Sequence, residues 1–88
     1  MNVKIISSLV QHNVRTTQEH LVDIREFIED YATDSEGENY FSELDAEAYF
    51  IMVKVTRKKN SKNQGIRALI EFLERRRILD DINRLLKK

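Results

Sequence analysis

The chain has 88 residues with no cysteine, no proline and two glycines, and its 15 basic and 15 acidic residues give a formal net charge of zero. This length allows one domain, which buries only about 60% of the surface that the unfolded chain exposes. The absence of cysteine excludes disulfides and thiolate chemistry, and no apolar run approaches the roughly 18 residues of a membrane-spanning helix. Residues 1–14 lack the pattern of a signal peptide, and the absence of cysteine fits a reducing compartment, so we expect a cytoplasmic protein. We expect a single helical domain over residues 1–88, with residues 78–88 extending into an oligomer or partner interface.

The charges are divided along the chain. Residues 1–53 carry three basic and eleven acidic side chains, a net charge of −8, and residues 54–88 carry twelve basic and four acidic ones, a net charge of +8. This separation of charge gives the protein an electrostatic dipole, which affects how the protein associates and how salt changes that association. It favours a protein that presents charged surfaces to other macromolecules.

The first predicted helix covers residues 3–12. Its apolar residues lie on one face at 100° per residue, and these are Val3, Ile5, Ile6, Leu9 and Val10. Asn2 precedes them and can cap the helix. A strand is excluded here because the adjacent apolar pairs would point to opposite faces of a sheet.

The second predicted helix covers residues 17–33, and Thr16 with Glu19 forms a capping box at its start. Its apolar stripe consists of Leu21, Ile24, Phe27, Ile28 and Tyr31. The opposite face is acidic, and we expect it to contact a basic partner through Glu19, Asp23, Glu26, Glu29 and Asp30.

The loop that follows resembles the calcium-binding loop of an EF-hand over residues 32–43. Asp34, Glu36, Gly37 and Glu43 occupy the third, fifth, sixth and twelfth positions of that motif. Ala32 stands at the first ligand position without a side-chain oxygen, and the chain has no second hand. We therefore expect a solvated acidic loop. His12 and His20 have no partners at metal-ligand spacing, so we expect surface histidines and no cofactor.

The third predicted helix covers residues 41–59. Its apolar residues fall within about 100° of one another on a helical wheel, and these are Phe41, Leu44, Ala48, Ile51, Met52 and Val55. The alternative is an α+β fold with a strand at residues 48–56, which are rich in aromatic and β-branched residues. The absence of any breaker between Leu44 and Lys59 favours the helix.

The fourth predicted segment covers residues 64–86, and its apolar face changes along the way. Ile66, Leu69, Ile70 and Leu73 share one face of its first half, and the apolar residues of its second half share the opposite face. Either one long or bent helix exposes its second half, or the chain breaks near residues 77–81 and a fifth helix folds back. No glycine or proline supports a break, so the long helix is favoured. Its exposed residues would then form a partner or oligomer interface, and these are Ile78, Leu79, Ile82, Leu85 and Leu86.

A basic stretch connects the third and fourth segments. Residues 54–67 contain six basic side chains and no acidic one, and these are Lys54, Arg57, Lys58, Lys59, Lys62 and Arg67. Unpaired cations of this kind are needed to bind phosphates or an acidic protein. They are equally compatible with a solvated helix end, where cations are favoured by the helix dipole.

No motif in the chain indicates catalysis, since there is no glycine-rich phosphate loop and no serine in a nucleophile turn. We therefore expect an all-α bundle of four helices that acts as a small non-enzymatic regulatory or inhibitory binding protein. It would act through protein–protein contacts, with a homodimer as the expected assembly and with no membrane or small-molecule substrate. The alternative is a nucleic-acid-binding regulator that uses the basic stretch.

Overall fold

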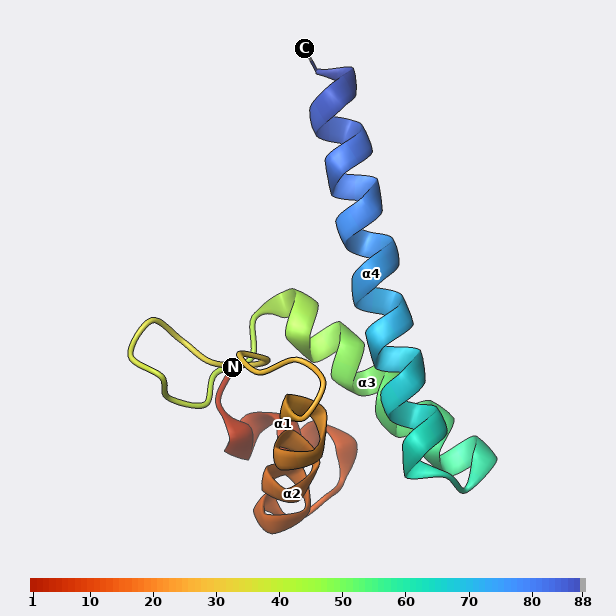
Figure 1. Ribbon diagram of the computed structural model, residues 1–88. Helices are drawn as coiled ribbons and strands as arrows, with labels where there is room; N and C mark the ends of the chain where they lie inside the picture. Colours follow the sequence, from red (N-terminus) through yellow and green to blue (C-terminus); the bar gives the residue numbers. More distant parts are fainter. Residues whose placement is uncertain (88) are drawn as a thin grey trace. The chain divides into compact units, whose positions relative to one another are not determined.

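The computed structural model describes residues 1–87, which form four α-helices (Figure 1). The helices are α1 (Val3–Val10), α2 (Val14–Arg25), α3 (Glu43–Lys59) and α4 (Lys62–Leu86). The predicted all-α class is confirmed. The alternative with a strand at residues 48–56 is wrong, because this stretch lies inside α3. An isolated antiparallel bridge joins Thr33 and Asn39 in the loop between α2 and α3.

The chain divides into two compact units, Met1–Phe50 and Ile51–Lys88. The first unit contains α1, α2 and the beginning of α3, and the second contains the rest of α3 and α4. Residues 51–53 are uncharged, so the division of charge coincides with the division of structure, with −8 on the first unit and +8 on the second. That one domain spans residues 1–88 stays a prediction.

Both ends of helix α1 are capped by hydrogen bonds, to a side chain at its start and between backbone groups at its end. The Oδ1 atom of Asn2 accepts a hydrogen bond from the backbone N–H of Ile5 at 2.9 Å, so Asn2 is the cap that the sequence predicts. Gln11 adopts the left-handed conformation with φ 60°, and His12 N–H donates to the carbonyl of Ser7 at 2.9 Å. This pattern is a Schellman motif, which ends the helix at Val10, two residues before the predicted end.

Helices α1 and α2 pack together through a small apolar core. Its buried members are Val3, Ile6 and Val10 of α1 with Leu21 and Ile24 of α2. A buried polar pair crosses this contact, because Ser7 Oγ lies 2.7 Å from both the carbonyl of Val3 and Oγ1 of Thr17. A hydroxyl has one proton to donate, so Thr17 donates to Ser7 when Ser7 donates to Val3. Ile5 and Leu9 lie outside this core and are exposed.

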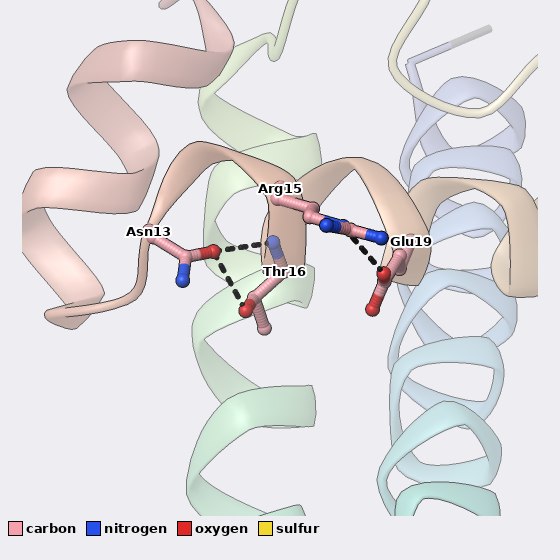
Figure 2. Close-up of polar contacts among 4 residues, drawn as sticks. All are labelled: Asn13, Arg15, Thr16 and Glu19. Atoms are coloured by element: carbon pink, nitrogen blue, oxygen red, sulfur yellow. Dashed lines mark hydrogen bonds and ion pairs between the residues drawn. The ribbon is translucent and has the colours of Figure 1, made fainter.

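Helix α2 begins three residues before the predicted start. Asn13 is its cap, and its Oδ1 atom accepts from the backbone N–H of Thr16 at 2.7 Å and from the Thr16 hydroxyl at 2.9 Å (Figure 2). The predicted capping box at Thr16 is therefore wrong. Glu19 lies instead beside Arg15 one helical turn away, at 3.4 Å. Asparagine is a stronger cap than threonine, and the earlier start adds a helical turn.

Helix α2 ends at Arg25, eight residues before the predicted end. The guanidinium of Arg25 turns the following chain back, because Nε donates to the carbonyl of Tyr31 at 2.9 Å and Nη2 donates to that of Ala32 at 3.1 Å. This turn buries Tyr31 and Ala32 and leaves the Phe27 side chain 66% exposed. The prediction that Phe27 belongs to the buried stripe is therefore wrong.

Helix α3 begins with a reciprocal cap. Asp45 N–H donates to Ser42 Oγ at 3.1 Å, and Ser42 N–H donates to Asp45 Oδ2 at 3.2 Å. This capping box begins the helix at Glu43, two residues after the predicted start. Just before it, Phe41 N–H donates to the carbonyl of Met1 at 2.7 Å, and the Met1 amino group donates to the carbonyl of Phe41 at 2.6 Å.

An aromatic cluster forms the centre of the first unit. The rings of Tyr31 and Phe41 meet edge to face at 6.1 Å, and those of Phe41 and Tyr49 lie 5.5 Å apart. Such pairs add stabilisation beyond their buried area. Tyr49 lies outside the predicted stripe of α3 and is nevertheless fully buried, so α3 uses a broader face than the predicted one.

Helices α3 and α4 are joined by a tight connection in the second unit. Asn60 is left-handed with φ 50°, Ser61 N–H donates to the carbonyl of Thr56 at 3.2 Å, and Ser61 Oγ accepts from Gln64 N–H at 3.3 Å to cap α4. A Cβ atom at Gly65 would lie 2.7 Å from the carbonyl oxygen of Met52 and would clash with the Thr56 hydroxyl. Only glycine lets the start of α4 approach α3 this closely.

Candidate protein-binding surface

The second half of α4 presents a row of large aliphatic side chains to solvent. We call this row the α4 apolar surface. Its members are Ile78, Leu79, Ile82, Leu85 and Leu86, whose side chains are 45–79% exposed. The alternative, a break near residues 77–81, does not occur, since α4 is one helix from Lys62 to Leu86. The prediction of a long helix is confirmed.

The first half of α4 uses the opposite face. Ile66 and Leu69 are buried. At 100° per residue, they lie on the side of the helix opposite the α4 apolar surface. Within the described residues of the second unit, no other helix lies beside residues 78–86 (Figure 1). One helix thus has a buried apolar face over its first half and an exposed one over its second half.

Ion pairs follow the sides of α4 away from the apolar surface. Arg76 lies 3.8 Å from Asp80, as the i, i+4 spacing predicts. Asp81 lies 3.9 Å from Arg84, one helical turn later. These groups are exposed, and exposed pairs contribute little to stability.

The six basic residues between residues 54 and 67 are all exposed. The last turn of α3 contains Arg57, Lys58 and Lys59, where the helix dipole favours cations, and Lys62 begins α4. Lys54 and Lys58 share a face of α3 because they are four residues apart. Arg67 lies 3.9 Å from Glu71, an acid just beyond the stretch. The structure therefore places these cations around the connection between α3 and α4.

The acidic residues do not share one helical face, contrary to the prediction. Glu19 and Asp23 lie on α2, but the helix ends at Arg25, so Glu26, Glu29 and Asp30 lie in the turns that follow. Glu26, Glu29 and Asp30 are exposed. A contact of these five residues with a basic partner stays a prediction.

The side chains of the two histidines contact each other, although their spacing in the sequence did not indicate this contact. The rings of His12 and His20 lie 5.5 Å apart in an edge-to-face arrangement. Nδ1 of His20 lies 2.8 Å from the hydroxyl of the buried Tyr49. The α1–α2 turn brings them together, and no periodic signal marks such a contact. Among residues 1–87, no three histidine, aspartate or glutamate side chains gather as a metal site would require.

In the loop between α2 and α3, the carboxylate of Asp34 accepts hydrogen bonds from the loop's own backbone. Oδ1 of Asp34 accepts from the N–H groups of Glu36 and Glu38, each at 2.9 Å. Gly37 supplies the left-handed residue of this turn, with φ 81°. Asp34, which holds the third position of the EF-hand pattern, therefore acts as a turn-forming residue.

No family model matches the chain, and comparisons with curated proteins and with solved structures find no significant match. Within the described helices, none is both long and apolar enough to cross a membrane.

Proposed function

We propose that this is a small, non-enzymatic binding protein of a regulatory kind, which acts through protein–protein contacts and associates with itself. The observation that supports the proposal is the α4 apolar surface. Single exposed aliphatic residues are ordinary on protein surfaces. A contiguous row of five, all at least 45% exposed on one face of one helix, is typical of an interaction site.

The energetics favour an association that depends on concentration. Fully burying one leucine or isoleucine side chain contributes about 1.5–3 kcal/mol. When two copies pair, five roughly half-exposed side chains from each become buried, which contributes on the order of 10 kcal/mol. The loss of translational and rotational freedom opposes this by about 4–15 kcal/mol. Because the two terms are of similar size, we expect a reversible dimer.

The substitution Ile82→Asp tests this proposal. It places a carboxylate at the centre of the surface on both copies, and each buried carboxylate costs several kcal/mol, so we expect dimerisation to weaken by about 100-fold or more. Ile82 is exposed within the single chain, so the variant should keep its helical circular dichroism. Sedimentation equilibrium over a range of protein concentrations measures the change.

Asn83→Asp is the matched control, because it adds the same charge one residue away and about 100° around the helix. We expect it to retain most of the association. A wild-type protein that stays monomeric at every concentration would refute self-association. So would an Ile82→Asp variant whose molar mass equals that of a dimeric wild type.

Nucleic-acid binding through the basic stretch is the second candidate function. It is supported by the exposure of all six cations in a unit whose net charge is +8. Titration of the full chain into labelled duplex and single-stranded DNA and RNA tests it. If it is correct, affinity falls by about 0.9 log units per log unit of salt for each duplex phosphate contacted. No binding at the lowest salt concentration removes this candidate.

A further inference from the structure

We infer that two copies pair through the α4 apolar surface as antiparallel helices, related by a two-fold axis that passes beside Ile82. This inference rests on the proposed self-association and adds the direction and the register of the pairing. It commits the surface to one occupant, which is the same surface of a second copy.

The apolar residues are placed symmetrically along the helix about Ile82. Ile78 and Leu86 each lie four residues from Ile82, and Leu79 and Leu85 each lie three residues from it. Reversing the direction of the helix about Ile82 therefore maps the row onto itself. A two-fold interface needs such self-complementarity, because the same patch must serve both copies.

Helical geometry then gives the contacts. At 100° per residue the row covers about 120° of the helix and is centred on Ile82. Ile78 and Leu85 lie on one side of that centre, and Leu79 and Leu86 lie on the other. In the antiparallel pair, Ile82 meets Ile82 of the second copy. Leu79 lies beside Leu86 of the second copy, and Ile78 lies beside its Leu85.

The charges upstream of the row disfavour the parallel alternative. Glu71 and Arg75 are exposed, and they lie on the same face of α4, nearer its start. Glu71 lies seven residues before Ile78, and Arg75 lies seven residues before Ile82, so each is turned by only about 20° from that apolar residue. A parallel pair would place Arg75 beside Arg75 and Glu71 beside Glu71, and such like-charge contacts are costly at an interface. The antiparallel pair carries Arg75 past the end of the second helix instead.

Single cysteines test the direction and register, because the chain contains none of its own. Four full-length variants are made: Leu79→Cys, Leu86→Cys, Ile82→Cys and Arg84→Cys. Each is oxidised alone, and Leu79→Cys is also oxidised in a mixture with Leu86→Cys. Disulfides form only where the two Cα atoms lie about 4.4–6.8 Å apart. We expect the mixture to give a Leu79→Cys/Leu86→Cys product several-fold in excess of the products of either variant alone.

The remaining variants distinguish a wrong direction or register of the pairing from an absence of self-association. Ile82→Cys reports self-association in either direction, and Arg84→Cys lies on the far side of the helix and reports chance collisions. If Leu79→Cys cross-links to itself as readily as to Leu86→Cys, the pairing is parallel and the inference is wrong while self-association stands. If Ile82→Cys cross-links but the mixture does not exceed the Arg84→Cys level, the register is wrong. If no variant exceeds that level and the wild type is monomeric, the proposed self-association fails as well.

Discussion

Tyr31 connects three parts of the first unit through one side chain and its own carbonyl. Its hydroxyl donates to the carbonyl of Asp45 at 2.6 Å, its ring meets Phe41, and its carbonyl accepts from Arg25. Burial raises the pKa of the Tyr31 phenol far above its ordinary value of 10.0. The charges of Asp45 and Tyr49 raise it further, and Arg25 opposes them. The phenol therefore stays protonated in the folded protein.

This raised pKa predicts a loss of stability in alkali. Below pH 10 the phenol is protonated in both states, and its contribution to stability is complete. Above about pH 10 the unfolded chain ionises and the folded one does not, so the free energy of unfolding falls as pH rises. Tyr31→Phe should cost about 0.5–1.5 kcal/mol at neutral pH through the lost hydrogen bond. It should also show a smaller alkaline loss in urea unfolding than the wild type does.

Tyr40→Phe is the matched control for this measurement, because it removes a tyrosine hydroxyl from a side chain that is half exposed. It should cost little at neutral pH. An alkaline loss that is identical in the wild type and in Tyr31→Phe would contradict the role assigned to the buried phenol.

Among the structural elements, the end of α2 depends on a side chain that lies on the helix itself. Besides the two carbonyls, Nη2 of Arg25 donates to Oδ1 of Asn39 at 2.9 Å. One planar guanidinium thus ties together α2, the turn at residues 26–32 and the loop before α3. The Tyr40 N–H group, which donates to the carbonyl of Ala32 at 2.8 Å, lies in the region that this network holds in place.

Arg25→Lys should weaken this region, although it keeps the charge. A lysine ammonium cannot reproduce the fork of the guanidinium, so at least one acceptor in this partly buried site loses the donor that Arg25 supplies, at a cost of about 1–3 kcal/mol. Hydrogen exchange of the Tyr40 amide should accelerate accordingly. Arg15→Lys is the control on the same helix, since the Arg15 and Glu19 side chains are 87% and 65% exposed and such pairs contribute little. Equal exchange in the two variants would argue against the network.

At the scale of the whole molecule, the division into two units is also a division of charge. Met1–Phe50 is strongly negative and Ile51–Lys88 is equally positive. Two modes of self-association therefore respond to salt in opposite ways. Attraction between the negative unit of one copy and the positive unit of another weakens as salt screens it. Pairing through the α4 apolar surface brings together like charges, because residues 76–88 carry five basic and two acidic side chains.

We therefore expect dimerisation to tighten several-fold between about 50 and 500 mM salt, over which the screening length falls to a few ångströms. Sedimentation equilibrium across this range measures the effect. A dimer that weakens with salt would indicate charge attraction between unlike units and would contradict the α4 apolar surface as the contact. Nucleic-acid binding through the basic stretch must weaken with salt in any case, so the two proposed functions have opposite signatures.

The sequence by itself determined that most of the chain would be helical, and it favoured an all-α fold of four helices. Apolar residues at helical spacing and a chain almost free of breakers leave few alternatives. It also favoured exposure of Ile78 and Ile82, because in a continuous helix they lie on the face opposite the apolar residues of the first half. The cap at Asn2 is likewise local, since the side chain accepts a hydrogen bond from Ile5, three residues away.

Only the tertiary structure decided where α2 ends, that Phe27 is exposed, and that His20 meets Tyr49. The physical reason is that these outcomes depend on contacts between residues more than one helical turn apart, from six positions for Arg25 and Tyr31 to 29 positions for His20 and Tyr49. Residues 26–32 have the spacing of a helix, but Arg25 gains acceptors at Tyr31, Ala32 and Asn39 only when that helix is broken. Periodicity describes which residues share a face, and hydrogen bonds formed on folding decide how far that face extends.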